Sequence, residues 1–245
     1  MPIDINSQVA SSVTALEREF NAITHNLANV NTVGYKRIAS SFSRALEAQQ
    51  KVTSGADSSE ADLNLHLDLS QGLSFIETGR SLDVALYGKG FFVVETPDGL
   101  LYTRNGSFKA NQNGQIVDSM GRVVAGEAGP ITISGDTSVS QINISSDGTV
   151  SANGQELGKF RIVDLGENEG KITAAGGSCF KVPEDVEPIV AGDVAVRQGY
   201  LESSNVKMVE ELVGMIMVSR LYDANMKFVT ARKEAAGSLM SVAMG

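Results

Sequence analysis

The side chains best suited to chemistry are few in this 245-residue chain. The two histidines, His25 and His66, are the candidate bases, and the single cysteine, Cys179, is the candidate nucleophile. A nucleophilic cysteine needs a base beside it, and both histidines fall in segments whose patterns predict other roles. We therefore expect Cys179 to be a small buried hydrophobe, and we expect the chain to have no catalytic residue and no enzymatic activity.

Two short patterns superficially resemble ligand-binding motifs. Gly88-Lys89-Gly90 precedes an apolar run, but a dinucleotide fingerprint needs a third glycine and a following helix, whereas a strand pattern follows here. Polar residues alternate in the segment Asp62-Leu63-Asn64-Leu65-His66-Leu67-Asp68 in a way that suggests a calcium loop. An EF-hand would need glycine at position 67 and glutamate at position 73, and both positions are leucine. We expect no cofactor and no metal.

The composition limits the classes of partner. The chain has 29 acidic and 20 basic residues, a formal net charge of -9, and it gains no counterion release on a phosphate backbone. Nucleic acid is therefore not an expected partner. Residues 1–20 lack the basic head and apolar core of a cleavable signal peptide, and no run approaches the roughly 18 apolar residues of a membrane span.

The N-terminal segment has the pattern of an amphipathic helix. Apolar residues follow one another at alternating steps of four and three, which keeps them on one side of a helix. They are Val9, Val13, Leu16, Phe20, Ile23, Leu27 and Val30. The predicted helix is roughly 33 Å long. It ends in the segment 29–34, where asparagines and Gly34 turn the chain, and Tyr35 and Lys36 are expected to begin a new surface.

The C-terminal segment repeats this pattern. The spaced positions are Met208, Leu212, Met215, Ser219, Tyr222, Met226, Val229, Lys233, Ala236, Met240 and Ala243. Asn205 is the expected N-cap, with Glu210 and Glu211 near the positive end of the helix dipole. Methionine is unbranched and adaptable, so a methionine-rich face suits several different neighbours. The alternative is an amphipathic helix packed on an ordinary core.

Between the helices the pattern has a period of two. Short apolar runs are separated by turn dipeptides such as Asp98-Gly99 and Asn153-Gly154, which favour antiparallel hairpins. We predict an α+β fold in which two heptad helices form a coiled-coil-like pair and flank a central antiparallel β domain. The expected parts are a helix and turn (1–37), an extended or short-helix linker (38–71), the β domain (72–200) and a second helix (201–245).

Two terminal apolar seams cannot both pack easily on one β domain. We therefore expect the two helices to pack on each other or on other copies of the chain. The predicted assembly interface comprises Val9, Val13, Leu16, Phe20, Ile23, Leu27, Met208, Leu212, Met215, Tyr222, Met226 and Val229. Burial of each leucine, phenylalanine or methionine would contribute roughly 1.5–3 kcal/mol.

The turn after the first helix resembles a known signature. The segment 26–37, NLANVNTVGYKR, resembles the N-terminal motif of flagellar rod and hook proteins. The segments 81–94, 97–108 and 199–212 resemble later parts of the same family, in the same order. The residues carried over from the family motifs are Asn26, Leu27, Ala28, Asn29, Thr32, Gly34, Tyr35, Ser204, Asn205 and Val206.

The resemblance implies a structural subunit of the flagellar basal-body rod, whose terminal helices pair in an inner tube. It implies as partners copies of this chain, other rod proteins and the flagellar type III export apparatus. It also implies a place in the periplasm-spanning rod, reached without a cleaved signal peptide. The short length and the segment 126–133 favour a proximal over a distal rod position.

Three alternatives remain open at the level of sequence. The first is a self-contained β domain with a helical hairpin that binds a cell-wall polysaccharide or another ligand. The second is a hydrolase, whose activity would depend on His66. The third is a hook or hook-junction relative, which would normally be longer.

Overall fold

The computed structural model describes residues 5–39, 66–192 and 194–244, with only the backbone described for residues 5–10, 167, 169 and 236–244. Residues 62–65 of the alternating segment compared above with a calcium loop lie outside the described residues. The chain divides into two compact units. Unit 1 comprises Met1–Ala28, Ile38–His66 and Lys207–Gly245, and unit 2 comprises Asn29–Arg37 and Leu67–Val206. The four-part division expected from the sequence stays a prediction.

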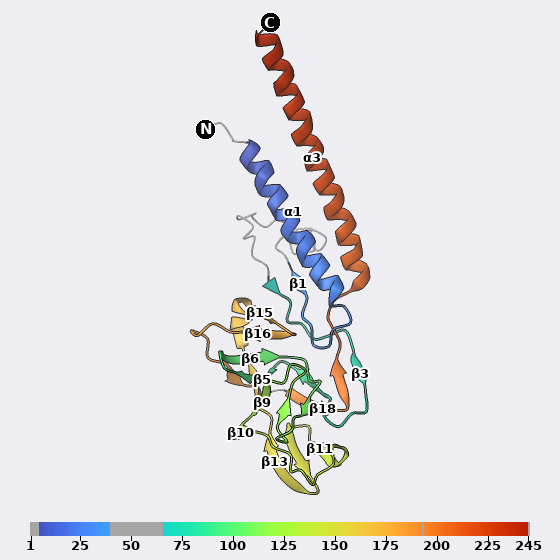
Figure 1. The fold of residues 1–245 in the computed structure, drawn as a ribbon, viewed down its shortest axis with the longest axis vertical. Coiled ribbons are helices and arrows are strands. Elements are labelled where there is room, and N and C mark those ends of the chain that lie inside the picture. Colours follow the sequence, from blue (N-terminus) through green and yellow to red (C-terminus); the bar gives the residue numbers. More distant parts are fainter. Residues whose placement is uncertain (1–4, 40–65, 193, 245) are drawn as a thin grey trace, which may run out of the picture. The chain divides into compact units, whose positions relative to one another are not determined.

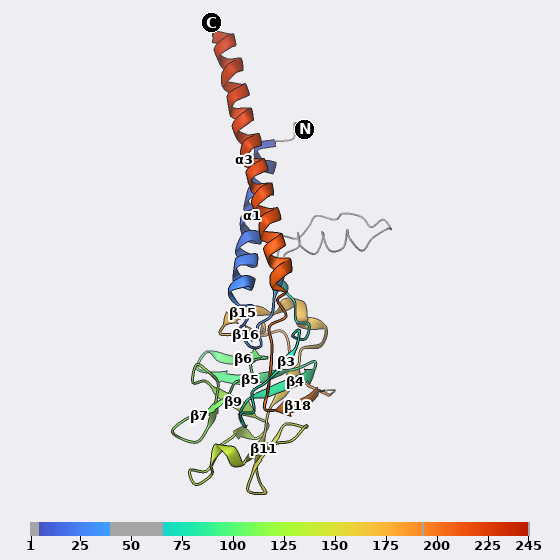
Figure 2. The same ribbon diagram turned by 90° about the vertical axis from the view of Figure 1, so that its right-hand side faces the viewer.

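Unit 1 is built on two long helices. They are α1 (Ile5–Ala28) and α3 (Met208–Met244). The two helices run side by side in opposite directions (Figures 1 and 2). Strand β1 (Ile38–Ala39) pairs with β2 (His66–Leu67) in a two-stranded sheet. The predicted helical segments are confirmed, and α3 carries Glu210 and Glu211 in its first turn.

Unit 2 consists mainly of short strands. The first are β3 (Phe75–Glu77), β4 (Val84–Gly88), β5 (Phe91–Thr96), β6 (Gly99–Thr103), β7 (Lys109–Ala110), β8 (Ile116–Val117), β9 (Val123–Gly126) and β10 (Gly129–Pro130). The later ones are β11 (Ile142–Ile144), β12 (Thr149–Ala152), β13 (Gln155–Lys159), β14 (Ile162–Asp164), β15 (Thr173–Gly176), β16 (Cys179–Lys181), β17 (Ile189–Val190), β18 (Val194–Gln198) and β19 (Tyr200–Glu202). Two 3₁₀ turns cover Val139–Gln141 and Gly166–Lys171.

The strands pair antiparallel in four sheets. The largest has the order β15-β16-β6-β5-β9-β8-β7, with β10 beside β9 and with β14 between β5 and β17. Strands β11, β12 and β13 form a meander, β18 pairs with β4, and β19 pairs with β3. The α+β prediction is therefore confirmed. In β12–β13, Asn153 and Gly154 both have positive φ (53° and 81°), as a two-residue hairpin turn requires.

The core of unit 2 lies on both sides of β5. Phe92 packs in one cluster with Phe108 and Phe160, with ring centroids 5.0 and 5.6 Å away. Phe91 points to the other cluster and meets Phe180 edge-on at 5.8 Å. Successive side chains alternate across a strand, so the continuous run FFVV at 91–94 serves both clusters because β5 is covered on both faces.

Candidate assembly interface

The helix pair of unit 1 is held by a small apolar core. Leu16 and Ile23 of α1 are buried with Val218 of α3, and Met215 and Tyr222 pack partly buried against them. Ile23 also approaches Gly214, where an added Cβ would lie 3.3 Å from the Ile23 Cδ1 atom. Such a close approach lets the two helix backbones draw together.

The predicted interface residues fall into three groups. Leu16 and Ile23 are buried, and Val13, Leu27, Met215 and Tyr222 are half-buried. The exposed members are Phe20, Met208, Leu212, Met226 and Val229, each about 40 to 45% accessible. The side chain of Val9 lies outside the described residues. The contacts within one chain therefore use only part of the predicted set, and the role of the whole set stays a prediction.

The face of α3 that meets α1 differs slightly from the predicted stripe. Val218 is buried, whereas the predicted neighbour Ser219 is exposed, and Glu211 is buried, whereas Leu212 is exposed. The predicted stripe was chosen by apolar residue type, so it could not include the charged Glu211. Glu211 can be buried because its carboxylate has a hydrogen-bond partner inside the helix pair. Its position one turn before Met215 was the available signal.

That partner is Asn26, the first residue of the family motif. Its Nδ2 donates to Glu211 Oε1 at 3.2 Å and to the Ile38 carbonyl at 2.9 Å, and its Oδ1 accepts from the Ile38 amide at 2.8 Å. Asn26 and Glu211 are 1% and 2% exposed. A buried polar contact between apolar helices has one favourable partner position, so this contact fixes the register of α1 against α3.

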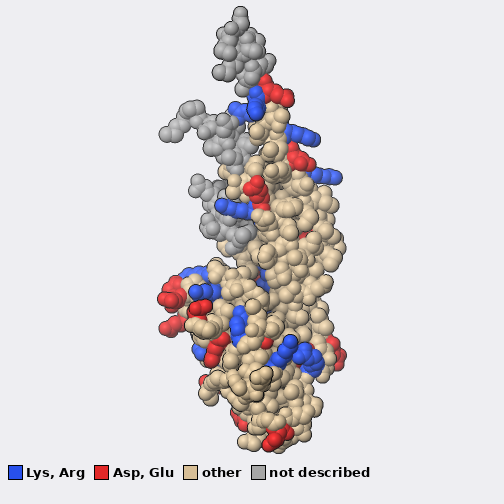
Figure 3. Space-filling model, viewed as in Figure 1, with Lys and Arg blue, Asp and Glu red and all other residues tan. Residues whose placement is uncertain are grey.

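The first turns of α3 are apolar on nearly every side. Val209, Val213 and Ile216 are 73, 51 and 56% exposed, although they lie on faces turned away from Val218. The surface over this part of α3 shows few charges (Figure 3). A helix that is hydrophobic all round is normally buried, and α1 covers only one side of it. This helix pair therefore has the properties of an assembly surface.

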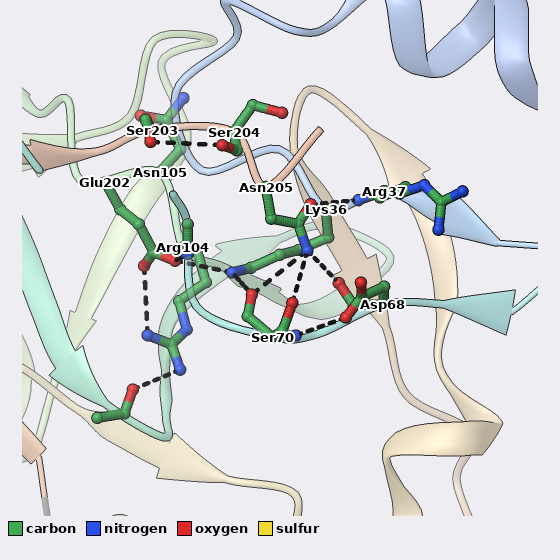
Figure 4. A network of polar contacts seen from close by, with 12 residues as sticks. Lys36, Arg37, Asp68, Ser70, Arg104, Asn105, Glu202, Ser203, Ser204 and Asn205 are labelled. Atoms are coloured by element: carbon green, nitrogen blue, oxygen red, sulfur yellow. Dashed lines mark hydrogen bonds and ion pairs between the residues drawn. The ribbon is translucent and has the colours of Figure 1, made fainter. Parts of the chain in front are cut away.

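A second set of motif residues meets inside unit 2, around the carboxylate of Glu202 (Figure 4). Lys36 Nζ lies 2.7 Å from Glu202 Oε1, and Arg104 Nη1 lies 3.3 Å from Glu202 Oε2. The side chains of Lys36, Arg104 and Glu202 are 0, 3 and 0% exposed. The expectation that Lys36 begins a new surface is wrong, because its ammonium group finds this carboxylate and the Ser70 carbonyl, at 2.5 Å, in the interior.

Burial lowers the pKa of Lys36 below its ordinary value of 10.5, and the attraction and hydrogen bond of Glu202 oppose the shift. Lys36 and Arg104 both contact the buried carboxylate of Glu202, and Arg104 repels Lys36. The half-buried Asp68 attracts Lys36 from further away. Glu202 is therefore the group on which the charge balance of this cluster depends.

Asn205 ties together three segments that are far apart in sequence. Its Oδ1 accepts from the Arg37 amide at 2.7 Å, and its Nδ2 donates to the Asp68 carbonyl at 2.8 Å. The expected N-cap role of Asn205 is wrong, because α3 begins at Met208 and the Asn205 side chain is engaged here. Of the neighbouring motif residues, Ser204 and Val206 are also buried, and the Ser204 Oγ accepts from the Val206 amide.

Gly34 allows the N-terminal motif to enter this cluster. It has φ +65°, and a Cβ on it would overlap the backbone of Arg104 and Asn105. Its amide donates to the Glu202 carbonyl at 2.9 Å, while Asn29 accepts from the Thr32 amide at 3.0 Å in the preceding turn. The motif glycine is therefore required both by its dihedral angle and by the close approach of a second backbone.

The three candidate catalytic residues of the sequence, Cys179, His25 and His66, lie in separate elements of the structure. Cys179 is 2% exposed, as expected for a small buried hydrophobe, and burial raises the pKa of its thiol. Arg122 Nη2 donates to its Sγ at 2.9 Å, and the same guanidinium pairs with Asp118. His25 is exposed on α1, and His66 lies in β2. Among the described residues, no group of three or more His, Cys, Asp or Glu side chains could hold a metal.

Comparison with known proteins defines the class. Residues 10–36 match the family described as flagella basal body rod protein. Residues 85–152 match the D1 domain of flagellar hook protein FlgE/F/G, and residues 197–242 match the C-terminal region of the flagellar basal body rod FlgEFG protein. The matched ends include most of α1 with its turn and most of α3 with the strand before it.

Whole-length relatives agree with these matches. The flagellar basal-body rod protein FlgG of Buchnera aphidicola subsp. Acyrthosiphon pisum is 34% identical, over 90% of this chain and 92% of the relative. FlgF of Rhizobium meliloti is 32% identical over 94% and 92%, and FlgG of Bacillus subtilis is 29% identical over 95% and 96%. The chain belongs to the flagellar basal-body rod protein family, whose FlgF and FlgG members are structural proteins.

No helix among the described residues is both long and apolar enough to span a membrane.

Proposed function

We propose that this chain is a structural subunit of the proximal flagellar rod, which polymerises through α1 and α3 to build the drive shaft for motility. The observation that supports this best is the apolar surface of α3, which extends round the helix although α1 covers only one side. Neighbouring copies and other rod proteins would supply the remaining cover. The predicted interface set is the surface that we assign to these contacts.

The energetics favour cooperative assembly. Phe20, Met208, Leu212, Met226 and Val229 are each about 40 to 45% exposed, and covering each would contribute about 1 kcal/mol. Association costs roughly 4–15 kcal/mol in lost freedom of motion. One neighbour therefore barely offsets the cost, whereas several neighbours around each helix pair exceed it.

The direct test places a charge on the exposed part of this surface. Leu212→Asp should abolish sedimentation of polymers of the purified chain, because the carboxylate would be buried without a partner between copies. Ser11→Asp, on the exposed polar face of α1, is the matched control and should polymerise like the wild type. Polymerisation of Leu212→Asp at the wild-type concentration would count against the proposal.

The small number of gaps in the alignment with an FlgF protein supports a proximal, FlgF-type position. The FlgF of Rhizobium meliloti needs 232 aligned positions to cover 94% of this 245-residue chain, so few gaps are required. The FlgG of Buchnera needs 248 positions to cover 90%, so it carries segments that have no counterpart here. The distal position is the alternative. Complementation of strains lacking FlgF or FlgG separates the two, because only the matching strain should regain motility.

The same proposal covers location and export. A rod subunit belongs in the periplasm-spanning basal body, and we propose delivery by the flagellar type III apparatus through the uncleaved N-terminal region. Deleting residues 2–8, which precede the buried residues Leu16 and Ile23 of α1 in the sequence, should leave the chain in the cytoplasm. Its appearance in purified basal bodies would contradict this route.

A further inference from the structure

A groove runs along one side of the helix pair. It has a volume of about 420 Å³ and is lined by Leu16, Glu17, Phe20, Asn21, Val218, Ser219 and Tyr222. Its floor is apolar, because Leu16 and Val218 belong to the core of the pair, and Phe20 is 42% exposed beside them. Glu17 is an exposed carboxylate at its rim that makes no ion pair with any side chain in the described ranges.

A ridge with matching properties lies on another side of α3. Val209, Val213, Ile216 and Arg220 follow at steps of four, three and four, so they form one stripe along the helix. The three apolar members are more than half exposed. Arg220, at the end of the stripe, is also exposed, and it has no ion-pair partner in the part of the chain that the structure describes.

The two unmatched charges lie at the same height on the helix pair. α1 and α3 are antiparallel, with Asn26 level with Glu211 and Ile23 level with Gly214. The groove brings Glu17 level with residues 218–222, which is the height of Arg220. At 100° per residue, however, Arg220 projects some 160° away from Val218 round α3, so it does not face the groove of its own chain.

We propose that the Ile216–Arg220 end of the ridge of one copy seats in the groove of a second copy of this chain, with Ile216 against the apolar floor and Arg220 of the first copy paired to Glu17 of the second. This proposal rests on the proposed rod function and specifies the surfaces that meet. An apolar stripe ending in a cation fits an apolar groove rimmed by an anion. Equal heights mean that parallel neighbours need little axial shift. Ridge and groove are different surfaces, so the contact is heterologous and repeats into an open helical array.

Charge reversal tests the contact. Glu17→Arg and Arg220→Glu should each raise the critical concentration for polymerisation by at least about tenfold, because like charges then meet at every contact. The double variant carrying both changes should polymerise within about twofold of the wild type. An equimolar mixture of the two single variants should also polymerise, since each groove then finds a ridge of opposite charge on the other variant.

The control is Arg18→Glu, which makes the same change in charge as Arg220→Glu on the side of α1 away from the groove. It should polymerise normally, and circular dichroism should show wild-type helix content for all variants. Normal polymerisation of Arg220→Glu, or failure of the mixture to co-polymerise, would overturn the contact. A wild-type chain that forms no polymer would instead overturn the rod function, and the contact with it.

Discussion

The structure allows the loss in the free energy of unfolding to be worked out for the removal of the Glu202 carboxylate. The group faces Lys36 at 2.7 Å and Arg104 at 3.3 Å, and its Oε1 also accepts from the Gly72 amide at 2.7 Å. Glu202→Ala would remove the carboxylate that Lys36 and Arg104 share, and a single broken buried pair costs about 3–5 kcal/mol. The unmatched Gly72 amide adds about 1–3 kcal/mol. We expect a loss of at least about 4 kcal/mol in the free energy of unfolding of unit 2.

Lys36→Met should cost far less, although it removes a partner in the same ion pair. Arg104 and Glu202 would remain as a one-to-one pair, and the desolvation of the ammonium group would no longer oppose folding. We expect a change within about 1.5 kcal/mol of the wild type. Glu202→Gln keeps the volume and an acceptor but loses the charge, and it should fall between the two.

Urea unfolding followed by circular dichroism of the β structure measures all three variants. We expect the order Glu202→Ala, Glu202→Gln, Lys36→Met, from most to least destabilised. Equal losses in the free energy of unfolding for Lys36→Met and Glu202→Ala would refute this order. Equal losses would mean that only the Lys36–Glu202 pair matters and that the charge of Arg104 does not need Glu202 to balance it.

Three further predictions concern the same residues and their neighbours. As the pH rises from neutral toward 10.5, the free energy of unfolding of the wild type should increase relative to that of Lys36→Met. The reason is that the folded state loses the Lys36 proton at a lower pH than the unfolded state does. A difference in free energy of unfolding that stays constant with pH would contradict the lowered pKa. Gly34→Ala should lower the free energy of unfolding by more than about 3 kcal/mol, and Gly79→Ala by only about 1 kcal/mol. Both glycines have positive φ, but only Gly34 lies against a second backbone segment. Equal losses of stability in thermal unfolding would exclude the close approach. Asn26→Ala should destabilise the helix pair by about 2–3 kcal/mol, which would be measured as faster hydrogen exchange in α1. The control Asn21→Ala changes an exposed residue and should cost less than about 0.5 kcal/mol. Similar exchange rates in both variants would contradict the role of Asn26 in fixing the register of the two helices.

Local patterns made the elements predictable. The four-three spacing gave the two helices, and the Asn153-Gly154 pair gave a hairpin, because both signals depend on neighbours in the sequence. The cluster in unit 2 could not be predicted in this way. Lys36 and Glu202 are 166 residues apart, and an isolated lysine after a turn has no local mark of burial.

The candidate interface was predicted in part for a related reason. Apolar spacing identified Leu16 and Ile23, but it does not distinguish a contact within one chain from a contact between copies. Leu212 and Met226 fit the same heptad stripe as Met215, yet they remain exposed. Glu211 shows the opposite limit, since a charged residue is buried where Asn26 provides a hydrogen-bond partner.

The role of the terminal helices in building the rod can be tested by electron microscopy of basal bodies from cells in which the gene for this chain is deleted and replaced by either the wild type or Leu212→Asp. We expect complete rods and motile cells with the wild type, and basal bodies with a missing or truncated rod with Leu212→Asp. Complete rods in the deletion strain, or in the strain carrying Leu212→Asp, would contradict the claim that this chain builds the rod through its terminal helices.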